Sequence, residues 1–557
     1  MERRDFIRTL TTGSVGLTGL AGASVKGSRQ PANPGRPNIL VILADDMGYS
    51  DIGLFGSEIR TPNIDRLGSN GVSFNQFYNA ARCCPTRASL LTGLYPHQSG
   101  IGLMLQDLNK PGYRGELSDN SVTMAQALKA NGYSTSLAGK WHLTNVKRQE
   151  TKENWPLQRG FDRFYGFMYG ACDYYKPVGL TYGNEYIEPE ERDFYFTDAI
   201  TDHALEFMGE HIQGEQPFFQ YLAYTAPHWP LHALEEDINR YEGTYDVGWD
   251  QIREQRYQNL LKNNILNEEY PLAPRDPRIN AWEKEEHRNW EARRMAVYAA
   301  QVDRMDQNIG RVLNYLEKKG ELDNTLIFFL ADNGGAAERL SEGWSYLPAV
   351  SEKTRDGRPV KVGNKPDVMP GPPDTYQSYG IGWANASNTP FRLYKHWIHE
   401  GGISTPLLMH WPKGITRPGH MDRDRGHIVD IMKTCMEAAG AEYPDTYDGH
   451  SIQPMEGLSL TPAMDGKSRE LHSEIGWEHH GNKALRSGDW KLVYRRETDW
   501  EFSGMPSGQW QLYNVEQDRT ELKNLANEQP EKLKEMKELY QKWADRVGVI
   551  EYDKLRD

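Results

Sequence analysis

Short, uninterrupted apolar runs recur along this chain, and each is followed at once by polar or ionisable residues. The first run spans residues 38–44 and is followed by Asp45 and Asp46. A continuous apolar run, as opposed to an alternating one, is typical of a strand buried on both faces of a helix-covered sheet. Three later segments are also predicted to be strands followed by polar residues: residues 133–138, 218–224 and 326–331. With helical segments between them, these runs predict an α/β sheet.

Helices are predicted between these strands at residues 61–67 and 122–129. A third helix is predicted where the apolar residues of 302–316 share one face, and it ends at Gly320. Beyond about residue 466 the pattern changes. Residues 489–494 and 510–514 are typical of antiparallel strands. Residues 533–547 are typical of an amphipathic helix. We therefore expect a large domain at 37–465 and a smaller α+β domain at 466–557.

Two further segments are irregular in a different way. Residues 235–290 are charged, and we expect them to be largely helical and peripheral. Residues 336–387 are rich in Pro, Gly, Ser and charge. A loop of that length in a folded domain is either a lid or substrate-binding wall or a disordered segment, and we favour the wall.

The polar residues that follow the predicted strands are the candidate site. In open α/β sheets ligands bind at the carboxyl edge of the strands, so side chains from several strand ends meet there. Asp45 and Asp46 follow one strand, and Asp332 and Asn333 follow another. These hard oxygen donors, without His or Cys among them, suit Ca²⁺ or Mg²⁺ better than zinc. A single Asp pair at a strand end can equally be a helix cap.

Residues 83–93 are typical of a reactive residue at a helix N-terminus. Cys83 is followed by Pro85, which suits the first helical position, and by Arg87, which can donate two hydrogen bonds to an oxyanion. The alternative is a buried cysteine on an apolar helix. Basic residues at other loop and helix starts are expected to complete an anion pocket with Arg87: Lys140, His142, His228 and Lys395.

Composition limits the classes of partner. The formal net charge of −14 disfavours nucleic acid, which requires a basic face, so an anion site must be a local basic pocket. Four cysteines imply no disulfide framework. Cys435 lies in an apolar helical run and is expected to be a core thiol, whereas Cys83 and Cys84 could form a strained vicinal disulfide.

The first residues have the pattern of an export signal. Residues 1–23 contain Arg3 and Arg4, a mildly apolar run and small residues at its end, which resembles a bacterial twin-arginine signal peptide. A basic disordered tail is the alternative. Residues 24–36 are typical of a linker, and no other segment is apolar enough to span a bilayer. We therefore expect an exported, periplasmic protein without an integral membrane segment.

Taken together, these blocks resemble a known family. Residues 83–93 match the sulfatase signature in its C-x-P-[ST]-R form, with Thr86 in the allowed position. Five other blocks match in order: residues 38–46, 139–142, 226–228, 331–334 and 388–402. From about residue 37 to its end the chain resembles the type I, formylglycine-dependent, arylsulfatase A-like sulfatases of the alkaline-phosphatase-like superfamily. That resemblance implies a large mixed sheet sandwiched by helices.

The resemblance also implies a mechanism. Cys83 would be oxidised by a maturation enzyme to formylglycine (3-oxoalanine), whose hydrate attacks the sulfur of a sulfate monoester. One Ca²⁺ would be held by residue 83 with Asp45, Asp46, Asp332 and Asn333. Arg87, Lys140, His228 and Lys395 would hold the sulfate oxygens. His228 would also protonate the leaving oxygen, and His142 would take a proton from the second hydroxyl so that sulfate leaves. Cys84 is an unusual neighbour, but the spacing to Pro85 and Arg87 selects Cys83.

Two other functions remain open. The same fold supports phosphatases and phosphodiesterases, but those usually carry Ser or Thr as nucleophile and further ligands for two zinc ions. The second alternative is an exported sulfate- or glycan-binding protein with an inactive site. Against it, this chain has the expected residue at every catalytic position of the family.

The expected substrate is a sulfated polysaccharide or glycan fragment, or a small aryl sulfate, and the 15 Trp and 30 Tyr favour carbohydrate. His480 and Asn482 either reach that substrate or form a plain turn. The sequence leaves the sugar, the sulfated position, exo or endo action and the oligomeric state open.

Overall fold

The apolar run at residues 38–44 forms strand β1 (Asn38–Ala44), which is buried throughout and lies inside an eleven-stranded sheet. The structure, a computed structural model, describes residues 35–556 except 146–150, 215, 268–269, 345–349 and 497–506. The predicted signal segment and nearly all of the predicted linker lie outside the described residues.

Parallel pairing dominates the centre of the sheet. The strand order β8-β1-β7-β3-β4 is parallel throughout: β8 (Thr325–Ala331), β7 (Phe218–Ala223), β3 (Ser134–Lys140) and β4 (Arg163–Phe167). Antiparallel strands extend both edges: β11 (Ser404–His410), β2 (Val72–Tyr78), β5 (Leu180–Tyr182) and β6 (Glu185–Tyr186). Two short strands pair with β2 in parallel: β12 (His420–Asp422) and β13 (Gly426–His427). The prediction of a mixed α/β sheet is therefore confirmed.

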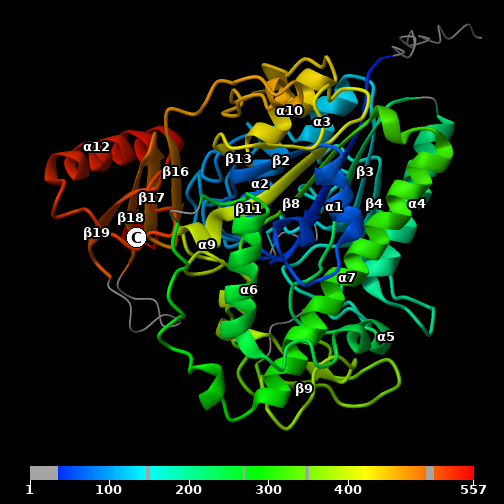
Figure 1. The fold of residues 1–557 in the computed structure, drawn as a ribbon. Coiled ribbons are helices and arrows are strands. Elements are labelled where there is room, and N and C mark those ends of the chain that lie inside the picture. Colours follow the sequence, from blue (N-terminus) through cyan, green and yellow to red (C-terminus); the bar gives the residue numbers. More distant parts are fainter. Residues whose placement is uncertain are drawn as a thin grey trace, which may run out of the picture. The chain divides into compact units, whose positions relative to one another are not determined.

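Helices cover both faces of this sheet, as Figure 1 shows. Alternate residues of β1 point to opposite sides, so Val41 lies in one hydrophobic core and Ile42 in the other. The Val41 side is covered by α2 (Cys83–Thr92), α3 (Met124–Ala130) and α10 (Asp430–Ala438). The Ile42 side is covered by α1 (Pro62–Ser69), α4 (Phe196–Gln213) and α7 (Arg288–Lys319). Burial on both sides explains why β1 and β8 are almost entirely apolar.

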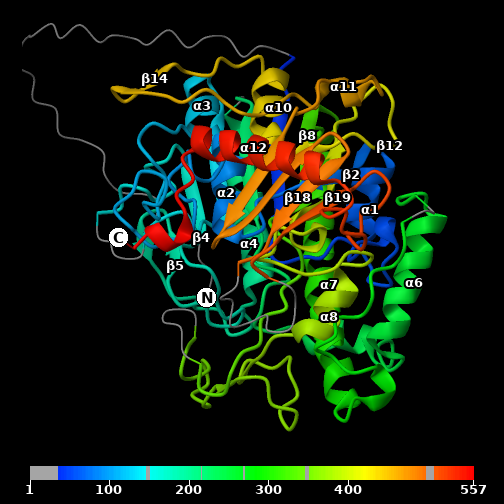
Figure 2. The same ribbon diagram turned by 90° about the vertical axis from the view of Figure 1, so that its left-hand side faces the viewer.

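The C-terminal region forms the predicted antiparallel sheet and helix. Its strands are β16 (Ile475–His479), β17 (Asn482–Ser487), β18 (Trp490–Tyr494) and β19 (Trp510–Asn514). Helix α12 (Pro530–Val547) crosses these strands in Figure 2 and packs Tyr540 and Trp543 against Leu492. The opposite face packs on Tyr78 and Ile403 of the larger sheet region. Residues 35–557 consequently form one compact unit.

The prediction for residues 235–290 is only partly correct. Helices α5 (Glu235–Ile238) and α6 (Gly248–Lys262) are present, but the described residues from 263 to 281 form turns and extended chain. Pro271, Pro274 and Pro277 explain the difference, because proline has no N–H to donate within a helix.

Residues 336–387 contain little regular structure, as expected, apart from short elements: β9 (Lys361–Val362), β10 (Thr375–Tyr376) and α8 (Gly380–Ser387). The remaining small elements are α9 (Glu400–Ile403), β14 (Thr446–Tyr447), β15 (His450–Ser451) and α11 (Thr461–Met464). Among the described helices, none has both the length and the apolar character needed to cross a bilayer.

Candidate functional site

Adjacent parallel strands bring the predicted oxygen donors together. Strands β1 and β8 pair in register up to Ala44 and Ala331, so the residues after them share one edge of the sheet. The backbone N–H of Asp46 donates to Asp332 Oδ1 over 3.1 Å, and Asn333 Nδ2 donates to Asp46 Oδ1 over 2.7 Å. With Asp45, these side chains form a cluster that is almost fully shielded from solvent.

The cluster has the features of a hard-cation site. Asp45 Oδ1 and Asn333 Oδ1 are buried and accept no hydrogen bond within the described residues. Burial raises the pKa of Asp45 well above its usual value and also raises the pKa of Asp46. Both observations mean that burying these oxygens is costly, and a bound cation offsets that cost. The residues therefore fit Ca²⁺, whose preferred ligands are carboxylate and amide oxygens.

Lys140 reaches this cluster from β3. The preceding Gly139 has φ 116°, and a Cβ there would lie 1.8 Å from the carbonyl oxygen of Ala223 on β7. Only glycine lets the two strands pair at this point. As a result β3 continues to Lys140, whose Nζ lies 2.6 Å from Asp45 Oδ2.

Helix α2 supplies Cys83 and Arg87. The helix begins at Cys83, so Pro85 occupies its third position. The prediction that Pro85 is the first helical residue was wrong. Proline at the third position costs no hydrogen bond, because the first four N–H groups of a helix have no partner within it. One turn later, the buried Arg87 donates from Nη2 to Asp332 Oδ2 over 2.8 Å and from Nη1 to the carbonyl of Lys140 over 3.2 Å.

Cys83 lies in an environment that favours its anion. A hydrogen bond from Cys84 holds the pKa of Cys83 well below its usual value, and His142 acts in the same direction against the effect of burial. His142 adopts a left-handed φ of 56°, which is rare for a residue with a side chain. Burial lowers the pKa of His142 to about 4, so its imidazole is neutral at pH 7. All four cysteines of the chain, Cys435 included, are buried and unbridged.

His228 and Lys395 lie on the other side of Asp46. His228 Nδ1 is 2.6 Å from the carbonyl oxygen of Trp229, which can only accept, so Nδ1 carries the proton. Its Nε2 is then unprotonated and can accept a hydrogen bond from Lys395 Nζ, which lies 3.2 Å away. Lys395 also donates to Asp46 Oδ2 over 2.8 Å. Burial and the neighbouring Lys395 lower the pKa of His228 well below its usual value.

Sequence reasoning missed Glu338 and Arg82. Glu338 accepts from Trp229 Nε1 over 2.6 Å and forms ion pairs with Lys395 at 3.5 Å and with Arg82 at 3.1 Å. Lys395 and Arg82 hold the pKa of Glu338 far below its usual value despite its burial. The only signal was position, because Glu338 closely follows the Asp332 strand end in the segment expected to form a wall.

The charges of this site balance without a metal. Three carboxylates face three cations: Asp45 pairs with Lys140, Asp46 with Lys395, and Asp332 with Arg87, which also lies 3.5 Å from Asp45. A divalent cation would leave this group with a net positive charge. The arrangement then suits an anionic ligand.

The two residues suggested for substrate contact, His480 and Asn482, belong to the C-terminal sheet. Asn482 is buried, donates to the carbonyl of His479 over 3.1 Å and accepts from the N–H of Arg496 over 3.2 Å, so its side chain stabilises the β16–β17 turn. His480, in that turn, packs against His396 with a ring-centroid distance of 5.0 Å.

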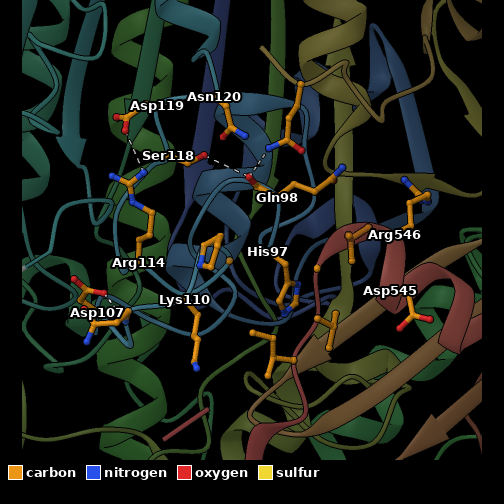
Figure 3. A pocket seen from close by; sticks show the side chains of 18 of the residues that line it. His97, Gln98, Asp107, Lys110, Arg114, Ser118, Asp119, Asn120, Asp545 and Arg546 are labelled. Atoms are coloured by element: carbon orange, nitrogen blue, oxygen red, sulfur yellow. Dashed lines mark hydrogen bonds and ion pairs between the residues drawn. The ribbon is translucent and has the colours of Figure 1, made fainter. Parts of the chain in front are cut away.

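A separate polar pocket of about 960 Å³ lies between residues 97–120 and the end of α12. Its lining includes His97, Arg114, Asp119 and Arg546, as Figure 3 shows. It contains none of the predicted site residues, and its mixed charges indicate no ligand class.

Known proteins are similar to this chain in both sequence and fold. The sulfatase family matches residues 37–441, and the C-terminal family of N-sulphoglucosamine sulphohydrolase matches residues 391–547. An arylsulfatase of Klebsiella aerogenes is 35% identical over 467 residues, covering 81% of this chain and 96% of that protein. An uncharacterized sulfatase of Schizosaccharomyces pombe is 33% identical over 548 residues, covering 92% and 94%. Superposition on the crystal structure of Ps i-CgsB gives a TM-score of 0.63 with 26% sequence identity, and the match covers 91% of this chain and 93% of that one. A second crystal structure shows Ps i-CgsB in complex with k-i-k-neocarrahexaose.

Proposed function

The chain belongs to the sulfatase family and is a hydrolase of sulfate esters, and we propose that an aldehyde hydrate formed at Cys83 is its nucleophile. The observation that carries this proposal is the position of Cys83 on the first turn of α2, beside His142 and next to the Asp45 cluster. A serine or cysteine in this place could attack once, but only a carbon with two hydroxyls can expel sulfate afterwards.

We propose that one Ca²⁺ is held by Asp45, Asp46, Asp332 and Asn333. Asp45 Oδ1 and Asn333 Oδ1, which accept no hydrogen bond within the described residues, support this, as does the fact that these four residues offer carboxylate and amide oxygens. When bound, the ion would lower the pKa of the nucleophilic hydroxyl. The carboxylates also hold the lysines, so the same residues set the position of the cations that meet the substrate.

Arg87, Lys140, His228 and Lys395 would bind the sulfate oxygens. Their nitrogens are already fixed by Asp332, Asp45 and Asp46, so little reorganisation is needed when negative charge develops on sulfate. Each such donor typically contributes about 10²–10³ in rate.

His228 and His142 would move protons at different stages. The Trp229 carbonyl fixes the proton of His228 on Nδ1, so Nε2 is the atom that can gain a proton and give it to the leaving oxygen. An anionic sulfate beside His228 would raise its pKa and favour this protonated form. His142, which is neutral at pH 7, would accept a proton from the second hydroxyl of residue 83.

We propose a sulfated carbohydrate as the substrate class. Two partly buried aromatic rings lie near His228: its neighbour Trp229, with ring centroids 4.4 Å apart, and Trp344 of the segment predicted to be a wall, 5.3 Å from Trp229. Aromatic faces suit sugar rings, and the complex of Ps i-CgsB with k-i-k-neocarrahexaose supports the same class. Small aryl sulfates would then act as artificial substrates.

We also propose that the enzyme acts in the periplasm after export by the twin-arginine route, with residues 1–23 removed as a signal. Arg3 and Arg4 before a mildly apolar run support this. A separate maturation enzyme would oxidise Cys83 before the chain is exported folded.

Mass spectrometry of the peptide that contains Cys83 tests the proposal. Co-expression with a maturation enzyme should convert the thiol to an aldehyde at Cys83 and not at Cys84. Cys83→Ala should abolish hydrolysis of an aryl sulfate, whereas Cys84→Ala, the matched control, should keep substantial activity. Equal inactivation of both variants, or full activity of unoxidised protein, would contradict the assignment. Faster hydrolysis of an aryl phosphate than of the sulfate would favour the phosphatase alternative.

A further inference from the structure

We propose that His396, His479 and His480 form a second metal site, which binds Zn²⁺. One ring nitrogen of each histidine lies within 4.8 Å of the corresponding nitrogen of the other two. His396 follows Lys395 in the loop before α9, while His479 ends β16 and His480 lies in the turn after it. The group therefore joins the C-terminal sheet to the segment that carries Lys395.

The central member, His479, has the features of an unoccupied ligand. Its side chain is 1% exposed, and neither Nδ1 nor Nε2 has a hydrogen-bond partner within the described residues. A buried imidazole that serves only for packing normally hydrogen-bonds through at least one nitrogen, because burying both unpaired is costly. Burial, followed by the charges of His480 and His396, lowers the pKa of His479 well below its usual value. The neutral ring then has a lone pair available for a metal ion.

The three rings contact one another: His479 packs edge-to-face against both His396 and His480, and the planes of His396 and His480 are tilted by 43°. Their centroids lie 4.5 Å apart for His479 and His480, 5.0 Å for His396 and His480, and 5.2 Å for His396 and His479. Nitrogens that share one tetrahedral Zn²⁺ lie about 3.4 Å apart, given Zn–N bonds of about 2.0–2.1 Å. Small side-chain rotations therefore suffice to close the site.

Backbone strain and an outer hydrogen bond support the same assignment. His396 has a left-handed φ of 83°, a strained conformation that is found preferentially at functional sites. The hydroxyl of Tyr552 lies 3.5 Å from His480 Nδ1. Such a partner on the far nitrogen orients the ring of a metal ligand.

The donor type separates this site from the two others near it. Three imidazoles suit Zn²⁺ and not Ca²⁺, whereas the Asp45 cluster offers oxygens. The other group with metal-binding spacing, Cys83, Cys84 and His142, would add thiolates to the coordination. Three protein ligands leave one position of a tetrahedral ion open to water or another ligand. Outside the group, the charge of Arg82 also acts on His479, and Arg82 is paired with Glu338 at 3.1 Å.

Titration of the whole, Ca²⁺-saturated protein with Co²⁺ tests the proposal, because tetrahedral Co²⁺ absorbs visible light and Zn²⁺ displaces it. We expect one equivalent to bind with a spectrum that lacks thiolate charge-transfer bands. His479→Gln and His480→Gln should each weaken Co²⁺ binding by about 100-fold or more. His287→Gln, at an exposed histidine, is the matched control and should bind like the parent.

Thermal unfolding without added metal establishes that each variant is folded. If His479→Gln does not fold, the partly exposed His480 still provides the test. Unchanged Co²⁺ binding in a folded variant, or a spectrum that disappears in Cys83→Ala and persists in His480→Gln, would overturn the proposal.

Discussion

Lys491 Nζ lies 2.8 Å from Glu400 Oε1, and both side chains are fully buried. Lys491 belongs to β18 of the C-terminal sheet, and Glu400 begins α9, shortly after Lys395. The same ammonium lies 2.8 Å from Glu521, and Arg519 Nε lies 3.1 Å from Glu400 Oε2. A buried network of four charges therefore ties the C-terminal sheet to the segment that positions Lys395.

The first prediction concerns this network. Lys491→Met should lower the free energy of unfolding by about 3–5 kcal/mol, because it leaves Glu400 and Glu521 buried with one cation between them. Chemical denaturation monitored by tryptophan fluorescence measures the change. Lys523→Met is the control, since Lys523 and Glu528 form an exposed pair at 3.5 Å and the change should stay below about 1 kcal/mol. Similar losses in both variants would contradict the network's role.

The second prediction is a pH dependence. Burial raises the pKa of Glu400, but Lys491 and Arg519 outweigh it and hold the pKa at about 2. Because this pKa is below the unfolded value of about 4.3, the stabilisation is complete above that pH and is lost as the pH falls towards 2. The stability difference between the native protein and Glu400→Gln should therefore shrink from pH 7 to pH 3. A constant difference in denaturation experiments would show that Glu400 acts through packing alone.

The sequence predicted which strand-end residues meet at one edge of the sheet but missed the buried charges around them, for a physical reason. Asp45 and Asp332 follow apolar runs, so strand pairing alone brings them together. Glu338, Glu400 and Lys491 are charged residues whose local sequence does not indicate that their side chains are buried. They are buried because elements far apart in the chain, such as α9 and β18, pack together, and no local pattern records that contact.

The third prediction concerns the metal. Removing Ca²⁺ with a chelator should lower the melting temperature and abolish hydrolysis, and adding Ca²⁺ should restore both. A ligand at 100 times its Kd stabilises the folded state by about 2.7 kcal/mol. Asp45→Asn should remove most of this Ca²⁺-dependent shift, as measured by calorimetry. Asp119→Asn, at a side chain that is 53% exposed, should retain it. A full shift in Asp45→Asn would exclude Asp45 as a ligand.

The fourth prediction separates binding of the sulfate group from support of the site. Lys395→Met should lower kcat/KM for an aryl sulfate by about 10²–10³, because it removes a charged donor that the carboxylates hold in place. Glu338→Gln should have a smaller effect of about tenfold, since Asp46 still holds Lys395 at 2.8 Å. Lys365→Met is the control. Lys365 pairs with the exposed Glu342, and its replacement should leave the rates unchanged. An equal loss in Lys395→Met and Lys365→Met would point to misfolding.

The fifth prediction distinguishes the two histidines by the stage at which each transfers a proton. His142→Gln should still release the alcohol of an aryl sulfate, but only about once per enzyme molecule, because the proton acceptor for the second stage is missing. His228→Gln should slow that first release, most strongly for alcohols of high pKa that need a proton to leave. Rapid-quench measurement of alcohol and sulfate gives both quantities. Since the pKa of His142 is about 4, its protonation should reduce turnover of the native enzyme only well below pH 6. Steady turnover by His142→Gln at the native rate would assign the second proton transfer to another group.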